Sequence, residues 1–153
     1  MKWSVHRPNP RFAIYNAETP GDMADDLVLD RETGIVWERA PKKKDITFLD
    51  AISHCVDIEV GGRKGFHVPM AEQLASLVDT SNSNPALPTN HPFLNVQFGG
   101  YWSATAYAGN PAVRWNVNFG DGVVRNVWFG SGNFVWCVRG GRSFDGQDLD
   151  SFN

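Results

Sequence analysis

The strongest constraint on the fold is a regular alternation of side chains in the last third of the sequence. Residues 113–119 alternate apolar and polar side chains, and this period of two predicts a strand with one apolar and one polar face. Glycine-containing turns are expected at 120–122 and 130–132, and residues 123–129 between them form a second expected strand. A third strand is expected at 133–139. We therefore expect a C-terminal three-stranded antiparallel meander.

Two helices are expected earlier in the chain. The first has apolar residues at i, i+3, i+4 and i+7, which lie on one helical face: Phe48, Ala51, Ile52 and Cys55. The second begins at Pro69, a residue type favoured in the first helical turn, and its apolar face is formed by Met70, Leu74, Leu77 and Val78. Short strands are expected before the helices at 27–30 and 35–38, and after them at 101–105. This order of elements predicts an α+β fold, with two helices packed on short antiparallel sheets.

The length of 153 residues fits one domain with flanking segments. Residues 1–26 contain three prolines and no sustained period, so we expect an irregular N-terminal lead-in with one short strand near 12–15. The domain itself is expected to span residues 27–142. The acidic and polar residues 143–153 are expected to form a loose tail.

The charge balance argues against a nucleic-acid partner. The net charge is −3, whereas phosphate binding needs a concentrated basic surface. The basic run from Lys42 to Lys44 follows Pro41 and predicts a solvated loop. No apolar run approaches the roughly 18 residues of a membrane span, so we expect no membrane insertion of this domain. We expect no signal peptide within this sequence, and if the protein is exported we expect the leader to lie upstream of it.

Cys55 and Cys137 are the two cysteines of the chain, and they are 82 positions apart. Neither a CxxC motif nor a Cys/His metal spacing is present, so a structural zinc site is not expected. Two alternatives remain open from the residues alone. The cysteines are two buried free thiols, or they form one long-range disulfide.

Six short segments follow one another in an order that is typical of one bacterial family. They are residues 30–39 (DRETGIVWER), Ala51 with Cys55, 65–69 (GFHVP) with Gln73-Leu74, 101–105 (YWSAT), 115–119 (WNVNF) and 137–141 (CVRGG). Together they resemble the C-terminal domain of Legionella-type collagen-like adhesins over residues 27–141. The third segment departs from the pattern of that family at Phe66, His67, Met70 and Gln73.

The resemblance implies a C-type-lectin-like fold. In that fold a cysteine on the first helix commonly bridges to one on the last strand, and this implies a Cys55–Cys137 disulfide and an oxidising compartment. It also implies an extracellular, cell-surface or periplasmic location. We expect structural roles for the aromatic and glycine residues of the motifs and for one arginine: Trp37, Trp102, Trp115, Arg139, Gly140 and Gly141.

The residues do not predict an enzyme, a cofactor or a metal site. None of the four histidines has an HExxH-type partner or lies beside a nucleophile motif. Formylglycine-generating enzymes share the lectin-like fold, but their chemistry needs closely spaced cysteines late in the chain, where only Cys137 is found. A calcium lectin site needs carboxylates, and Asn118 stands where such a site has an acidic residue.

A polar face of the meander is the candidate ligand surface. We expect ligand contacts from Arg114, Asn116, Asn118, Arg125, Asn126 and Trp128. Their donors suit sulfate, carboxylate or sugar hydroxyls, and the Trp128 indole suits a sugar ring or a protein partner unless it lies in the core. The leading prediction is recognition of a cell-surface glycan in adhesion, with a sulfated polysaccharide as its more specific form. The alternative is a protein-binding display domain, since residues 115–139 also resemble the variable segment of proteins diversified by a retroelement. A homo-oligomer is compatible with either function.

Overall fold

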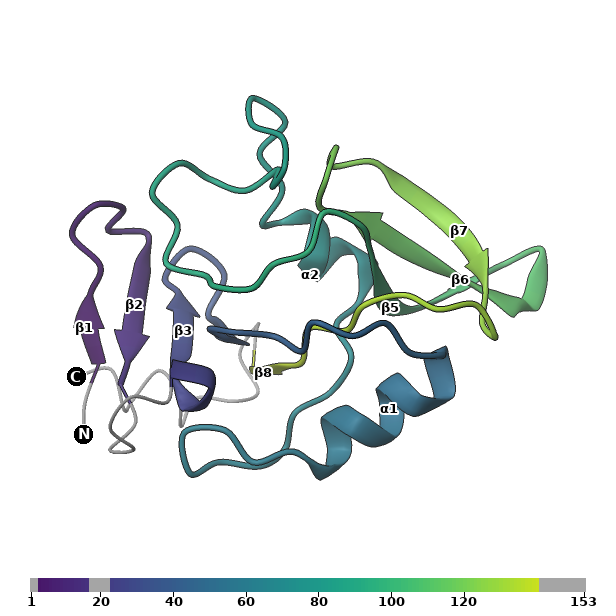
Figure 1. The fold of residues 1–153 in the computed structure, drawn as a ribbon, viewed down its shortest axis with the longest axis horizontal. Helices are drawn as coiled ribbons and strands as arrows, with labels where there is room; N and C mark the ends of the chain where they lie inside the picture. Colours follow the sequence, from purple (N-terminus) through teal and green to yellow (C-terminus); the bar gives the residue numbers. More distant parts are fainter. Residues whose placement is uncertain (1–2, 17–22, 141–153) are drawn as a thin grey trace.

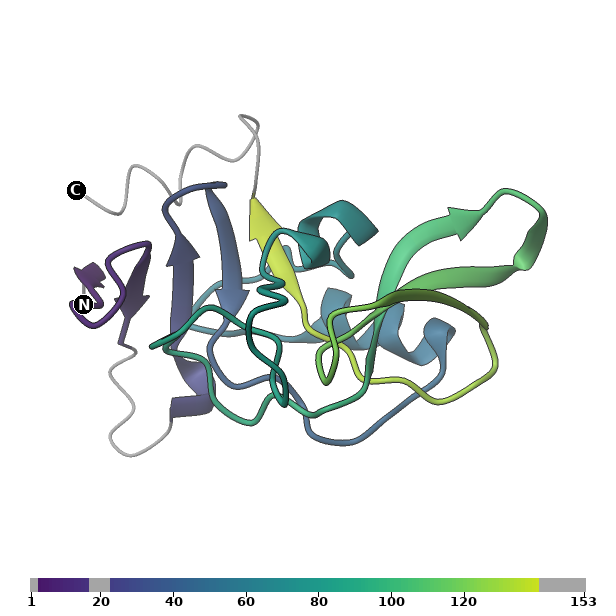
Figure 2. The same ribbon diagram turned by 90° about the horizontal axis from the view of Figure 1, so that it is seen from above.

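The computed structural model describes residues 3–16 and 23–140, and all structural statements below concern these residues. They form two antiparallel sheets and two α-helices, with a short 3-10 helix at Met23–Asp25 (Figures 1 and 2). The α+β class predicted from the order of elements is therefore confirmed.

The larger sheet has five strands in the order β1-β2-β3-β4-β8. The strands are β1 (Trp3–Val5), β2 (Phe12–Tyr15), β3 (Leu27–Asp30), β4 (Ile35–Glu38) and β8 (Val138–Gly140). The strands expected at 27–30 and 35–38 are present as β3 and β4 and form a hairpin, and Gly34 in its turn has a φ of +78°, a conformation that glycine adopts without steric cost.

Helices and strands cover both faces of this sheet. Successive residues of β3 point alternately into two apolar clusters, with Leu27 and Leu29 in one and Val28 in the other. Helix α1 (Phe48–Asp57) packs in the first cluster, and α2 (Ala71–Ala75) contributes Leu74 to the second. This two-sided burial explains why β3 and β4 are buried along their whole length.

The N-terminal segment is more regular than expected. The predicted short strand at 12–15 is present as β2, but residues 3–5 also form a strand, and both belong to the main sheet. Burial of Trp3 and Phe12 anchors these strands to the sheet. The sequence of this segment has no local periodicity that predicts this pairing. The expected tail at 143–153 lies outside the described residues.

The first helix was predicted correctly, with one correction. Thr47 Oγ1 accepts a hydrogen bond from the Asp50 backbone N–H and so caps the N-terminus of the helix. Phe48, Ala51 and Cys55 are buried, but Ile52 is 40% exposed and does not belong to the buried face. The reason is that a ten-residue helix packed at the edge of the molecule buries a narrow stripe.

The second helix is shorter than expected. Its N-cap is Met70, whose side chain is 40% exposed instead of packing in the core. The Gln73 side chain accepts a hydrogen bond from the Met70 N–H, and this interaction fixes the first turn. Leu74 and Leu77 are buried as predicted.

The smaller sheet consists of β5 (Gly100–Tyr107), β6 (Asn110–Asn118) and β7 (Val124–Trp128), in that order. The predicted meander is wrong in its third strand, because β8 pairs with β4 and not with β7. Residues 129–137 leave the small sheet and make only isolated bridges at Asn133 and Phe134 on the way. A hydrogen bond of 2.8 Å from Trp136 Nε1 to Glu38 O draws them to β4, and the disulfide at Cys137 ties them to α1.

The disulfide between Cys55 and Cys137 is present, with a Cα–Cα distance of 5.4 Å, so that prediction is confirmed. It joins α1 to the segment that enters β8. Trp37 and Trp102 are fully buried, as expected for core residues. Trp115 is only half-buried, and its ring packs against Tyr107 with centroids 5.3 Å apart.

Candidate functional site

The six predicted ligand contacts do not share one face of the small sheet. Residues opposite each other on antiparallel strands point to the same side, and Asn116 lies opposite Arg125 whereas Trp115 lies opposite Asn126. Arg114, Asn116 and Arg125 therefore lie on one face, and Asn126 and Trp128 lie on the other. The prediction of a single polar face is wrong because Arg125 and Asn126 are consecutive in a strand.

Arg114 and Asn118 are engaged in contacts within the domain. The Arg114 guanidinium lies 4.7 Å from the centre of the Phe48 ring, and its Nη1 donates to the carbonyl oxygens of Pro111 and Val113. Asn118 Oδ1 accepts the backbone N–H of Gly120 at 2.7 Å, which closes the turn after β6. These contacts assign Arg114 and Asn118 to the scaffold of the sheet.

Asn116 requires a correction, because its side chain is buried. It is 7% exposed, and its Nδ2 donates to Asn133 Oδ1 at 2.9 Å. A buried amide needs such a partner, and here the partner comes from the segment that crosses to β8. Asn116 holds this crossing segment against β6 and is withdrawn from solvent.

The exposed remainder is a strip along β7, which we call the β7 strip: Val123, Val124, Arg125, Asn126 and Trp128. The Trp128 side chain is 59% exposed, and Val124 is 44% exposed. The core interpretation of Trp128 is thereby excluded. Gly130 supports this position, since a Cβ at that residue would collide with the Trp128 ring. The strip offers one aromatic surface, one amide and one guanidinium to solvent.

The charge of Arg125 is partly neutralised by a neighbour. Its Nη2 lies 2.8 Å from Asp121 Oδ2 in an exposed i, i+4 pair. The hydrogen bond from Arg125 lowers the pKa of Asp121, and the same contact raises the pKa of Arg125. An anionic ligand that binds Arg125 must compete with this carboxylate.

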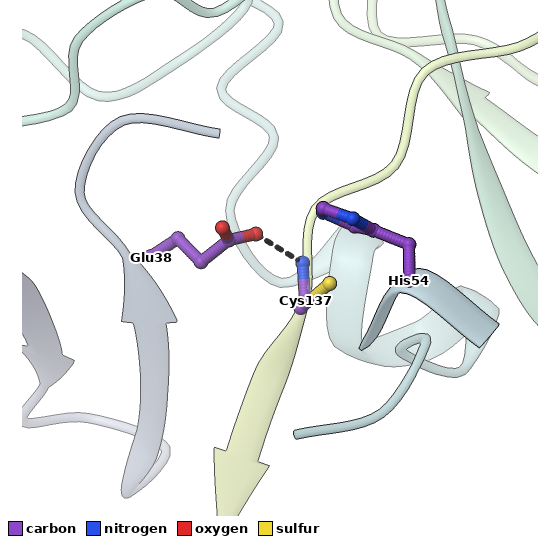
Figure 3. Close-up of side chains that lie close together, drawn as sticks. All are labelled: Glu38, His54 and Cys137. Atoms are coloured by element: carbon purple, nitrogen blue, oxygen red, sulfur yellow. Dashed lines mark hydrogen bonds between the residues drawn. The ribbon is translucent and has the colours of Figure 1, made fainter. Parts of the chain in front are cut away.

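A second cluster lies inside the domain, where Glu38, His54 and Cys137 approach one another (Figure 3). One potential ligand atom from each lies within 4.8 Å of the others. Glu38 Oε1 accepts the Cys137 backbone N–H at 2.7 Å, and burial raises the pKa of Glu38 to about 7. Burial lowers the pKa of His54, and the positive charge of Lys42 lowers it further. The carboxylate of Asp57 acts in the opposite direction.

This buried cluster does not form a metal centre in the disulfide-bonded protein. The Cys137 sulfur is bonded to Cys55, so it offers no thiolate, the form in which cysteine binds metals or acts as a nucleophile. The contacts instead link β4, α1 and the approach to β8. The burial of Glu38 was missed by sequence reasoning, although a glutamate directly after Trp37 in an otherwise apolar strand was a usable signal.

The remaining motif residues are placed as follows. The Arg139 guanidinium lies 5.9 Å from the centre of the Phe66 ring, which joins two of the motifs in space. Gly140 has a φ of +70°, a left-handed conformation that favours glycine, and it ends β8. Gly141 lies outside the described residues. Among the described helices, none has the length and apolar character needed to cross a membrane.

Comparisons with known proteins agree with the motif analysis. A family model described as the Lcl C-terminal domain matches residues 26–139. The match covers all strands from β3 to β7, both α-helices and both cysteines. A comparison with curated proteins gave no match.

Proposed function

Since this chain belongs to the Lcl C-terminal domain family, we propose that it is a non-catalytic ligand-recognition domain that binds a glycan at a cell surface. The fold we assign to it is C-type-lectin-like, with α1 tied to the last strand by the disulfide. A disulfide is the form that cysteines take in oxidising compartments, which supports an extracellular or periplasmic location.

The exposed Trp128 indole is the observation that carries this proposal. Trp128 is 59% exposed on β7, and Val124 on the same face of this strand is also exposed, so the face presents an apolar surface of the kind that marks an interaction site. Its flat apolar ring suits stacking on the C–H face of a sugar, and the neighbouring Asn126 amide suits hydrogen bonds to hydroxyl groups. The β7 strip therefore combines the two kinds of contact that sugar binding requires.

A sulfated polysaccharide is the more specific form of the proposal. Arg125 lies on the opposite face of β7 from Asn126 and Trp128, so a chain-like ligand would have to cross the strand edge to meet all three. The net charge of −3 opposes polyanion binding, and so does the Asp121 carboxylate beside Arg125. Binding of this type should weaken steeply with salt.

We propose no catalytic role. The cysteine sulfurs are bonded to each other, and two of the histidines are engaged in contacts within the fold. His6 Nε2 lies 3.0 Å from Asn90 O, and His91 Nδ1 accepts the Phe93 backbone N–H. The His6 contact joins the N-terminal strands to the loop before β5, and the His91 contact lies within that loop. Neither places a nucleophile beside a base.

A glycan array probed with the disulfide-bonded domain tests the proposal. We expect selective binding that is lost in Trp128→Ala and kept in Phe98→Ala. Phe98 is the matched control because it is equally exposed, at 61%, and lies outside the β7 strip. A heparin column at low salt tests the sulfated form, and absence of retention there rejects it. Binding that is unchanged in Trp128→Ala rejects the site.

A second candidate function is binding of a protein ligand by a display domain that a retroelement diversifies. The observation in its favour is that Val123 and Val124 are also exposed in the β7 strip, which makes the strip more apolar than a sugar requires. A reverse transcriptase and a near-identical template repeat beside the gene would support it. Their absence would remove the basis for diversification.

A further inference from the structure

The buried cluster of Glu38, His54 and Cys137 contains a nitrogen that the disulfide-bonded fold leaves unused. His54 Nε2 is buried, and among the described residues it has no hydrogen-bond partner. Figure 3 shows the His54 ring directed toward Glu38 and Cys137. Buried polar atoms nearly always have a partner, so a buried imidazole nitrogen without one is a signal for an ion in another state of the molecule.

The donors gathered around this nitrogen match the ligands of zinc. One potential ligand atom each from Glu38, His54 and Cys137 lies within 4.8 Å of the others. The Cys55 sulfur is bonded to the Cys137 sulfur, so it is a fourth potential ligand at the same place. Thiolate, imidazole and carboxylate are the groups that bind Zn²⁺ in proteins, four at a time and in tetrahedral geometry.

Opening the disulfide frees both sulfurs with little movement of the backbone. The Cα atoms of Cys55 and Cys137 are 5.4 Å apart. Two thiolates on one tetrahedral Zn²⁺ lie about 3.8 Å apart, because each Zn–S bond is about 2.3 Å long, and rotation of the two side chains reaches this separation. Glu38 Oε1 accepts the Cys137 backbone N–H at 2.7 Å, which holds the carboxylate beside the freed sulfur.

Charge and access also favour a cation. With both thiols deprotonated, the donors carry three negative charges at close range, which repel one another until a divalent cation neutralises most of them. Lys42 and Asp57 both act electrostatically on His54 with opposite signs, so neither side prevails around the cluster. His54 is only half-buried on α1, so an ion can reach the interior donors from solvent past this one side chain.

We propose that the dithiol form of the chain binds one Zn²⁺ at this cluster and releases it when the disulfide forms. The four ligands are Cys55, Cys137, His54 and Glu38. Every disulfide is preceded by two thiols, so the newly made chain passes through the zinc-binding form. The ion then holds α1 against the segment that enters β8 before the sulfurs join. This site lies in the interior, and the inference is independent of the ligand that the β7 strip recognises.

The two forms interconvert by a balanced redox step. A phosphine reductant delivers two electrons to the S–S bond and takes an oxygen atom from water, which yields two thiols and a phosphine oxide. Binding of Zn²⁺ then displaces the two thiol protons into water. In the opposite direction, a small disulfide oxidant takes two electrons from the thiolates and two protons from water. The Cys55–Cys137 bond forms, two small thiols leave and Zn²⁺ is released.

Titration of the full chain with Zn²⁺ against a chromophoric chelator, with and without prior reduction by a phosphine, tests the proposal. We expect one Zn²⁺ per reduced chain and none per disulfide-bonded chain. The Tm of the reduced chain should rise by about 5 to 10 °C when free Zn²⁺ is about 100 times its Kd, and the Tm of the disulfide-bonded chain should not change. Co²⁺ in place of Zn²⁺ should give the intense visible bands of tetrahedral coordination and a thiolate charge-transfer band.

His54→Gln distinguishes this site from zinc held by the two thiols alone. His54 is half-buried on the surface of α1, so the variant should fold. The Zn²⁺ affinity of its reduced form should fall at least about tenfold, since even a residue that only orients a ligand contributes that much. Glu38→Gln should weaken binding in the same way. His67→Gln and Glu59→Gln are the matched controls, because both residues are exposed and lie outside the cluster.

Four results would each overturn the proposal. They are a reduced chain that binds no Zn²⁺, a disulfide-bonded chain that binds it equally well, an affinity unchanged in His54→Gln, and a Co²⁺ spectrum without the tetrahedral bands.

Discussion

Replacement of Glu38 by glutamine should remove part of the pH dependence of the free energy of unfolding. Glu38 is 5% exposed, and burial raises the pKa of its carboxyl group from the ordinary value of 4.5 to about 7. The native state therefore binds more protons than the unfolded state between these values. The stability that the protonated carboxyl provides is fully present below about pH 4.5 and is lost as the pH rises through about 7. At about pH 8 the ionised carboxylate then costs about 3 kcal/mol, since one pKa unit corresponds to about 1.4 kcal/mol.

The variant retains the local hydrogen bond, because a glutamine Oε1 still accepts the Cys137 N–H. We expect the stability of Glu38→Gln relative to the original protein to be about 2 to 3 kcal/mol greater at about pH 8 than at about pH 5, because the unfolded-state carboxyl of the original protein is already mostly ionised at pH 5. Urea denaturation with the disulfide intact measures both free energies of unfolding. Glu59→Gln is the matched control, because it removes an exposed carboxylate and leaves the buried one. A difference between Glu38→Gln and the original protein that does not vary with pH would refute the reasoning.

Two further predictions concern the disulfide and the tryptophans. Reduction of the Cys55–Cys137 disulfide opens a link between residues 82 positions apart. It should lower the free energy of unfolding by about 4 kcal/mol and the Tm by well above about 5 °C. Thiol titration of the unreduced, denatured protein should find no free thiol, and two thiols would contradict the bridge. Trp102→Ala should cost about 3–5 kcal/mol, because the side chain is fully buried and its Nε1 donates to Ile46 O, whereas Trp128→Ala should cost less than about 1 kcal/mol. Equal losses in urea denaturation would contradict the assignment of Trp128 to the surface.

The elements that the sequence predicts well are those whose signal is local. Helix α1 has its cap and its apolar spacing within one stretch of residues, and the β3–β4 hairpin has Gly34 in its turn. The disulfide required the family resemblance, because the spacing of Cys55 and Cys137 is equally compatible with two free thiols. A local pattern fixes an element but not its partner.

The position of the last strand shows this limit. Residues 133–139 alternate as a strand should, yet the choice between β7 and β4 as its neighbour depends on contacts with residues about a hundred positions away. The Trp136 indole donates to Glu38 O, and the Cys137 N–H donates to Glu38 Oε1. Burial of an acidic side chain at the end of β4 is needed for this arrangement, and composition alone does not reveal it.

The candidate site was predicted on the small sheet, and more of its residues were assigned to the surface than the structure exposes. Polar residues in an alternating strand were assigned to solvent, but Asn116 is buried against Asn133, which precedes β8 by only a few residues. Because the path of that segment was mispredicted, the burial of Asn116 was mispredicted with it. Arg125 and Asn126 are exposed on the edge strand as expected, and Trp128, for which a core position was left open, is exposed there as well.

The central claim is that the β7 strip is the recognition surface, and a chemical-shift titration tests it most directly. The isotopically labelled, disulfide-bonded domain is titrated with the glycan that binds best on the array, and the amide and indole N–H signals are followed. We predict that the largest shifts fall on residues 123–128 and on the Trp128 indole N–H. Shifts confined to α1 or to the loop between α2 and β5, with the β7 signals unchanged, would contradict the claim.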